Sequence, residues 1–145
     1  MLLKNLIKNY PSHLKNEKIK GLSINSLNVK MGDLFFALKG TKINGEKYIE
    51  SAFKKGAKLA VCSPDYKSKR YFKKIITTKN VRKTLSYACA KFFKAKPKNI
   101  IAITGTNGKS SIADFFHQIL QAQKIPVATI GTLGIKKNKK SKKIG

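Results

Sequence analysis

The 145-residue sequence has no tryptophan and only six acidic residues, against 32 lysines and arginines. No apolar run approaches the roughly 20 residues that a membrane-spanning helix requires, and the lysine-interrupted N-terminus is too short for a signal peptide. We therefore expect a cytoplasmic protein that does not act at a membrane. The hydrophobic fraction of 41% is enough for a packed core and argues against a disordered chain.

Cysteine and histidine are also scarce. Cys62 and Cys89 stand among apolar residues without the C-x-x-C spacing of metal or redox sites, so we expect two buried free thiols. His13 and His117 have no cluster of further ligands around them, which makes a histidine metal site remote.

The net charge of +26 raises the question of nucleic acid, because lysines neutralise phosphates. Only Arg70 and Arg82 could make the bidentate contacts that specify bases. The lysines are spread along the whole chain and accompany 16 isoleucines and 10 asparagines, a joint excess typical of an A/T-rich genome. Nucleic-acid binding is therefore the weaker interpretation, although the charge should favour anionic ligands.

Residues 1–96 carry alternating helix and strand patterns that predict a small α/β domain. Strands are expected at residues 21–26, 34–38, 58–62 and 75–77. Helices are expected at residues 2–10, at 46–55, and from a cap at Asn80 to a point before Pro97. The spacing places the following side chains in or beside the core: Phe35, Ala37, Tyr48, Phe53, Val61, Leu85 and Phe92.

Residues 97–145 begin a second unit. A β-branched strand at 99–104, a glycine loop, a helix at 110–122 and a strand at 126–131 predict a βαβ unit with parallel strands. Asp114 and His117 fall on the polar face of that helix, opposite its apolar residues, and are expected in solvent. The lysine-rich tail at 136–143 is typical of a solvated, mobile segment.

The octet Thr104-Gly105-Thr106-Asn107-Gly108-Lys109-Ser110-Ser111 lies between the predicted strand and helix. Its glycines allow the backbone to aim N–H groups at an anion, and the helix N-terminus adds a partial positive charge. Lys109 supplies a charge for phosphates and Ser110 a hydroxyl for Mg²⁺. The general phosphate-loop pattern has glycine at the position of Ile103 in this chain. An ordinary strand-to-helix turn without a ligand therefore remains the alternative to a phosphate site.

The loop in this shortened form resembles the ATP loop of the Mur ligases and their folylpolyglutamate synthetase relatives. A second segment, Gly32-Asp33-Leu34-Phe35-Phe36-Ala37-Leu38-Lys39-Gly40 followed by Asn44-Gly45, is similar to the N-terminal domain of two Mur ligases. These members add the third amino acid and the terminal dipeptide. The loop and the segment Ile130-Gly131-Thr132-Leu133-Gly134 resemble the third-residue-adding member.

The resemblance implies an N-terminal UDP-substrate-binding domain at 1–96 and the truncated start of a P-loop ATP-binding central domain at 97–145. It also implies an ATP-dependent amide ligase of peptidoglycan synthesis that acts, as a monomer, on UDP-N-acetylmuramoyl-L-Ala-D-Glu. ATP would be held by Gly105, Thr106, Asn107, Gly108, Lys109, Ser110 and Ser111, with Ser110 on Mg²⁺. The UDP-sugar would contact Ile24, Ser26, Thr41, Lys42 and Ile43.

Two departures from the family pattern concern the UDP-sugar side. Asn25 and Leu27 replace the acid and the arginine of a usual D-S-R, and Thr41-Lys42 replaces a His-Gln-type pair. No catalytic residue is identifiable, and the chain alone is expected to be inactive. The alternatives are a dipeptide-adding Mur ligase and a non-catalytic nucleotide-binding module.

Overall fold

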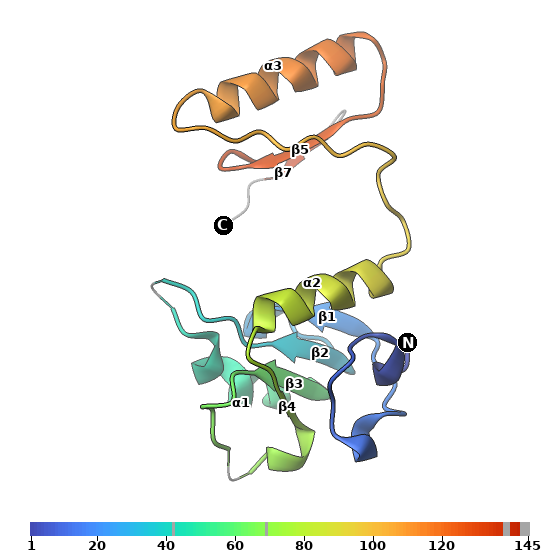
Figure 1. Cartoon of the computed structure of the whole chain (residues 1–145), viewed down its shortest axis with the longest axis vertical. Coiled ribbons are helices and arrows are strands. Elements are labelled where there is room, and N and C mark those ends of the chain that lie inside the picture. Colours follow the sequence, from blue (N-terminus) through green and yellow to red (C-terminus); the bar gives the residue numbers. More distant parts are fainter. Residues whose placement is uncertain (42, 69, 138–139, 143–145) are drawn as a thin grey trace. The chain divides into compact units, whose positions relative to one another are not determined.

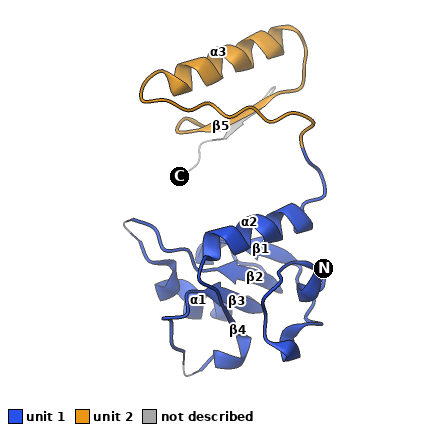
Figure 2. Ribbon diagram, in the orientation of Figure 1, with its two compact units in different colours: residues 1–96 blue, residues 97–145 orange. Residues whose placement is uncertain are grey.

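The computed structural model describes residues 1–41, 43–68, 70–137 and 140–142. It forms two compact units, Met1–Lys96 and Pro97–Gly145 (Figure 2). Both contain helices and strands, and unit 1 is built on a parallel sheet, so the predicted α/β class is confirmed. Among the described residues, no helix is long and apolar enough to cross a bilayer.

The sheet of unit 1 has four parallel strands in the order β1-β2-β3-β4 (Figure 1). They are β1 (Gly21–Ser23), β2 (Asp33–Phe36), β3 (Leu59–Cys62) and β4 (Ile75–Thr77). Every residue of the two central strands is buried, as the apolar run at 34–38 predicts. Parallel strands are covered on both faces, and such burial requires apolar side chains on both sides.

Alternate side chains of the strands enter two separate clusters. On one face Phe36 and Val61 pack with the N-terminal segment and with α2 (Val81–Phe92). On the other face Phe35 and Ala60 pack with α1 (Ile49–Lys54). The side chain of Asn80 accepts a hydrogen bond of 2.9 Å from the Lys83 amide, so the predicted cap of α2 is confirmed.

The described residues of unit 1 also form five short 3₁₀ helices: η1 (Leu3–Asn5), η2 (Ser12–Leu14), η3 (Ser26–Asn28), η4 (Gly45–Tyr48) and η5 (Phe72–Lys74). The predicted helix at 2–10 is reduced to η1, because the Leu3 amide bonds the Glu17 carbonyl at 2.9 Å and Leu2 bridges to Lys18. The core prediction is wrong only for Tyr48, which is 44% exposed. The chain is still 3₁₀ at that position, and this turns Tyr48 away from the face formed by Ile49 and Ala52.

Both cysteines are free thiols, as predicted, although only Cys62 is fully buried and Cys89 is half-buried. Burial, reinforced by the nearby Glu46 charge, raises the pKa of the Cys62 thiol to about 12. A thiol with this pKa carries almost no thiolate near neutral pH, so Cys62 is a packing residue.

Unit 2 consists of α3 (Lys109–Ala122) and an antiparallel sheet in the order β5-β6-β7. The strands are β5 (Ala128–Gly131), β6 (Gly134–Lys137) and β7 (Lys140–Lys142). The predicted strand at 99–104 and the βαβ unit are therefore wrong for this structure. Ile100 and Ile101 are 81% and 61% exposed, and β5 pairs with β6 through a tight turn that needs no distant partner. The described part of the lysine tail belongs to β6 and β7.

One face of α3 contacts the β5–β6 hairpin through polar groups. The Thr129 hydroxyl lies 3.2 Å from Nδ1 of His117, and Lys136 forms an ion pair with Asp114. His117 is only 5% exposed, which corrects the expectation that it lies in solvent. The apolar residues of α3 lie outward instead: Ile112, Phe115, Phe116 and Ile119 are 37–63% exposed.

Unit 2 is expected to be the less stable unit. Every buried hydrophobic side chain of the described residues lies in unit 1, and small pieces bury too little apolar surface to fold firmly alone. Amide hydrogen exchange should therefore be much faster in α3 and β5 than in β2 and β3. Equal protection in the two units would contradict this expectation.

Candidate functional site

The candidate phosphate loop precedes α3, and its backbone takes conformations that favour glycine. Gly105 has φ +148° and Gly108 has φ +73°. A Cβ atom at Gly108 would meet no atom within 4 Å, so glycine is needed there for its backbone angle and not because of crowding. Gly108 is the N-cap of α3, and no side chain caps this end of the helix. The first N–H groups of the helix can therefore donate to an anion.

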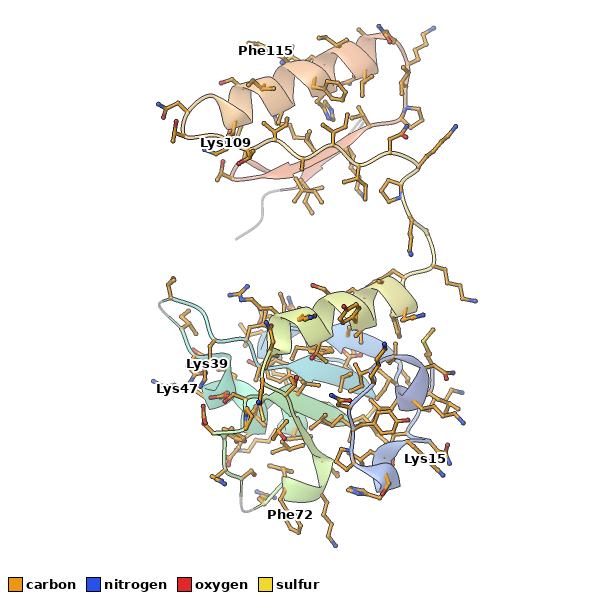
Figure 3. The ribbon with its side chains drawn as sticks, viewed as in Figure 1. Lys15, Lys39, Lys47, Phe72, Lys109 and Phe115 are labelled. Carbon is orange, nitrogen blue, oxygen red and sulfur yellow. The ribbon has the colours of Figure 1, made fainter. Side chains whose placement is uncertain are left out.

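Lys109 is the first residue of α3 and lies beside the loop (Figure 3). Its ammonium donates to the carbonyl oxygens of Gly105 and Thr106, the latter at 2.8 Å. An ammonium has three N–H donors, so one remains for a phosphate oxygen. The Lys109 ammonium thus links two carbonyl groups of the loop and places a positive charge beside them.

Ser110 connects the loop to the hairpin. Its hydroxyl lies 3.2 Å from the Thr132 hydroxyl, in the turn between β5 and β6. Ser110, Thr132 and Asp114 line the same pocket in unit 2. Within the described part of the chain, no group of three or more histidine, cysteine, aspartate or glutamate residues could hold a metal by itself. A Mg²⁺ ion at Ser110 would therefore need phosphate oxygens and water as further ligands.

The described residues among those predicted to contact a UDP-sugar follow the carboxyl ends of two neighbouring strands in unit 1. Ile24 and Ser26 follow β1, and the segment 41–43 follows β2, which pairs with β1 in parallel. Segments that follow the carboxyl ends of adjacent parallel strands share an edge, the usual place for ligands. Ile24 and Ile43 are 57% and 60% exposed and Thr41 is exposed, whereas Ser26 is buried. Lys42 lies outside the described residues.

A buried carboxylate holds the loop that contains Thr41 and Ile43. Glu46 is 8% exposed and accepts hydrogen bonds from the Ser63 hydroxyl at 2.6 Å and the Ser63 amide at 3.0 Å. Asn44 donates to the same carboxylate at 3.2 Å, and the Lys39 ammonium lies 3.8 Å away. Burial pushes the pKa of Glu46 upward, but these hydrogen bonds and the Lys39 charge outweigh it and lower the pKa.

The lowered pKa of Glu46 predicts a stability that depends on pH. A carboxyl group whose pKa is lower in the folded state than in the unfolded state stabilises the fold above its ordinary value, 4.5. This contribution should begin to decrease as the pH falls below that value and be lost as the pH falls through the lowered pKa of the folded state. In urea titrations between pH 7 and 3.5, Glu46→Gln should therefore lose less stability on acidification than the parent. An identical acid response would show that Glu46 carries no such linkage.

Glu46 and Ser63 were not among the predicted site residues, because they are far apart in sequence and neither belongs to a motif. The one local signal is Asn44, whose side chain accepts from the Glu46 amide at 3.0 Å and caps η4. Gly45 is required by crowding, since a Cβ atom there would lie 2.6 Å from the Leu38 carbonyl oxygen. The Asn44-Gly45 pair therefore shapes the loop next to the predicted substrate segment.

Comparison with protein families identifies the chain. Residues 18–123 match the model described as "Mur ligase family, catalytic domain", and residues 103–145 match "Mur ligase middle domain". The chain belongs to the Mur ligase family. The resemblance inferred from the loop and the N-terminal segment is thereby confirmed, and the second match includes the phosphate loop.

Curated relatives are similar to this chain over part of their length. The chain is 43% identical over 121 residues to the UDP-N-acetylmuramoyl-L-alanyl-D-glutamate–2,6-diaminopimelate ligase of Rickettsia montanensis and 39% identical over 118 residues to that of Bradyrhizobium diazoefficiens. These alignments cover 83% and 81% of this chain but 25% and 24% of the relatives. The chain thus spans about a quarter of their length.

Solved structures agree on the fold. A UDP-N-acetylmuramoyl-L-alanyl-D-glutamate–2,6-diaminopimelate ligase superposes with a TM-score of 0.75 and 22% identity, over 97% of this chain and 29% of its own. The MurF ligase of Thermotoga maritima in complex with ADP gives 0.55 and 21% identity, over 72% of this chain and 24% of its own.

Proposed function

We propose that this chain forms the substrate-binding and phosphate-loop part of an ATP-dependent ligase that joins the third amino acid to UDP-N-acetylmuramoyl-L-Ala-D-Glu. The observation that carries the proposal is the segment at residues 105–111 in a chain of the Mur ligase family. Its first residues form the glycine loop, and its last residues form the uncapped N-terminus of α3. The curated relatives are named for the same muramoyl dipeptide and for 2,6-diaminopimelate, which we take as the added amino acid.

The residues present fit a nucleotide phosphate. The positive φ angles of Gly105 and Gly108 shape the loop, and no side chain occupies the helix cap. Lys109 would bind an oxygen of the β- or γ-phosphate, while Ser110 would offer its hydroxyl to Mg²⁺. When bound, ATP supplies the phosphoryl group that activates the substrate carboxylate, and the magnesium ion offsets the developing charge.

In unit 1, the edge of the sheet formed by the segments after β1 and β2 would bind the uridine end of the substrate. Exposed Ile24 and Ile43 offer apolar contact to the base, while the exposed Thr41 hydroxyl could bind a carbonyl or a sugar hydroxyl. Glu46 would act on this site indirectly, by keeping the 39–45 loop in place through Asn44 and Lys39.

Two alternative functions make different predictions about ligands. A dipeptide-adding ligase would prefer the muramoyl tripeptide over the dipeptide as its UDP-linked substrate. A non-catalytic nucleotide-binding module would bind UDP as tightly as the complete UDP-sugar dipeptide. The relatives named for the third-residue reaction favour our proposal over both.

Competition calorimetry on the full chain tests the proposal. UDP-N-acetylmuramoyl-L-Ala-D-Glu should displace UDP and bind more tightly than UDP and than the tripeptide form. Thr41→Ala should weaken that binding, whereas Thr77→Ala, at the exposed end of β4, should leave it unchanged. Equal affinity for UDP and the dipeptide substrate would reject the ligase assignment. Binding that is indifferent to the ligand and vanishes with salt would indicate a nucleic-acid site.

A further inference from the structure

A large groove in unit 1 is lined by other residues than those of the two predicted ligand sites. It has a volume of about 770 Å³ and lies between the N-terminal segment 1–9 and residues 78–91, which comprise the end of the preceding loop and nearly all of α2. This volume falls within the range of about 300–1,000 Å³ that is usual for small-molecule sites. Of the described residues, none at 24–26, at 41, at 43 or in the loop at 105–111 lines it.

The charge around the groove has one sign. Among the residues that the structure describes, no carboxylate lines the groove, whereas five lysines do: Lys4, Lys8, Lys79, Lys83 and Lys91. All five are exposed, and none forms an ion pair with another described residue. The N-terminus of α2 adds a partial positive charge beside Lys79 and Lys83. Positive charges gathered round a concavity raise the local concentration of anions more than the same charges scattered on a surface.

The groove also offers an uncharged contact surface. Leu6 and Ile7 line it but are only 2% and 4% exposed, so the main apolar contact is Tyr87, which is 59% exposed. Asn5, Asn9 and Thr78 add amide and hydroxyl groups suited to a sugar or a phosphate ester. One wall, residues 1–9, lies before residue 18, where the match to the family catalytic domain begins. The other wall, residues 78–91, lies within that match.

We propose that this groove binds a phosphorylated small molecule with a ring, of the nucleotide class, with its phosphates on the lysines and its ring against Tyr87. A single-stranded nucleic acid fits less well. Such sites stack successive bases on several aromatic rings along a basic track, whereas Tyr87 is the one aromatic side chain that lines this groove among the described residues.

The test uses the full chain with Lys109→Ala, which weakens the other phosphate site, and follows backbone amide shifts in NMR titrations at about 0.15 M salt. The probes are inorganic pyrophosphate and ADP. Both should shift amides at residues 4–9 and 79–91, and ADP should bind more tightly because its ring contacts Tyr87. The double variant Lys4→Gln/Lys83→Gln should weaken ADP binding about five- to tenfold, since two exposed charge contacts are lost.

The matched control is Lys15→Gln/Lys54→Gln, which removes the same charge from exposed positions outside the groove and should change affinity less than about twofold. If the first double variant misfolds, Lys8→Gln/Lys91→Gln replaces it. Equal weakening by the groove and control variants would overturn the proposal, because non-specific charge would then explain the binding. A short single-stranded oligonucleotide that binds the groove more tightly than ADP would overturn the small-molecule assignment.

Discussion

Lys109→Ala should lower the affinity of the chain for ATP by about ten- to a hundredfold. The substitution removes a side-chain ammonium fixed beside residues 105–108, together with its bonds to the Gly105 and Thr106 carbonyls. Hydrogen bonds to charged groups contribute about 1.5–3 kcal/mol each, and 1.4 kcal/mol corresponds to a tenfold change in affinity. Calorimetric titration with Mg·ATP measures the effect.

The experiment needs a charge-matched control, because the 31 other basic residues also attract ATP. Lys98→Ala removes an exposed lysine from the same unit at a position before the loop. At about 0.15 M salt, where exposed charges are screened beyond about 8 Å, this variant should bind as the parent does. If Lys109→Ala retains the parent affinity under these conditions, the loop is not a phosphate site.

Binding is expected without turnover. Stabilising a transferring phosphoryl group requires a metal held by several ligands and a positioned acceptor carboxylate. Ser110 is the single metal ligand predicted here, and the nearest acid in sequence, Asp114, is paired with Lys136. The chain incubated with ATP, UDP-N-acetylmuramoyl-L-Ala-D-Glu and diaminopimelate should form no product. Product formation would show that this part of the ligase suffices.

Local patterns predicted unit 1 well, because its elements are specified by nearby residues. The cap at Asn80, the apolar run at 34–38 and the spacing of α2 each appear in the structure with little change. The misses have physical causes. The start of the segment at 2–10 bonds to residues 15–19, and the segment forms only one 3₁₀ turn of its own. Tyr48 lies in a 3₁₀ helix, which helix propensity does not predict.

Unit 2 was predicted less well because a parallel strand depends on partners that are distant in sequence. The segment 99–104 has the composition of a strand, but no described strand pairs with it. The hairpin of β5 and β6 needs only neighbouring residues and forms instead. The phosphate loop was predictable because its chemistry is contained in one octet. The Glu46–Ser63 contact was not, because it joins residues 17 positions apart without a motif.

Phe36→Ala should be the most destabilising of the proposed substitutions. Phe36 is completely buried and packs with Val61 and Ile76, so truncation leaves a cavity in a close-packed core. Such a change costs about 3–5 kcal/mol, a large part of the roughly 5–15 kcal/mol that holds a domain folded. Native-state hydrogen exchange of the β2 and β3 amides measures this loss for unit 1 separately from unit 2.

The matched control makes the same substitution on an exposed ring. Phe115, on the outward face of α3, is 63% exposed, so Phe115→Ala removes few contacts and should change stability by less than about 0.5 kcal/mol. Comparing the stability losses of Phe36→Ala and Phe115→Ala tests the burial of Phe36. It also tests the proposed difference in packing between the two units. If Phe115→Ala lowers the protection of α3 as much as Phe36→Ala lowers that of β2, the apolar face of α3 must be covered in solution. The assignment of unit 2 as the weakly packed unit would then be wrong.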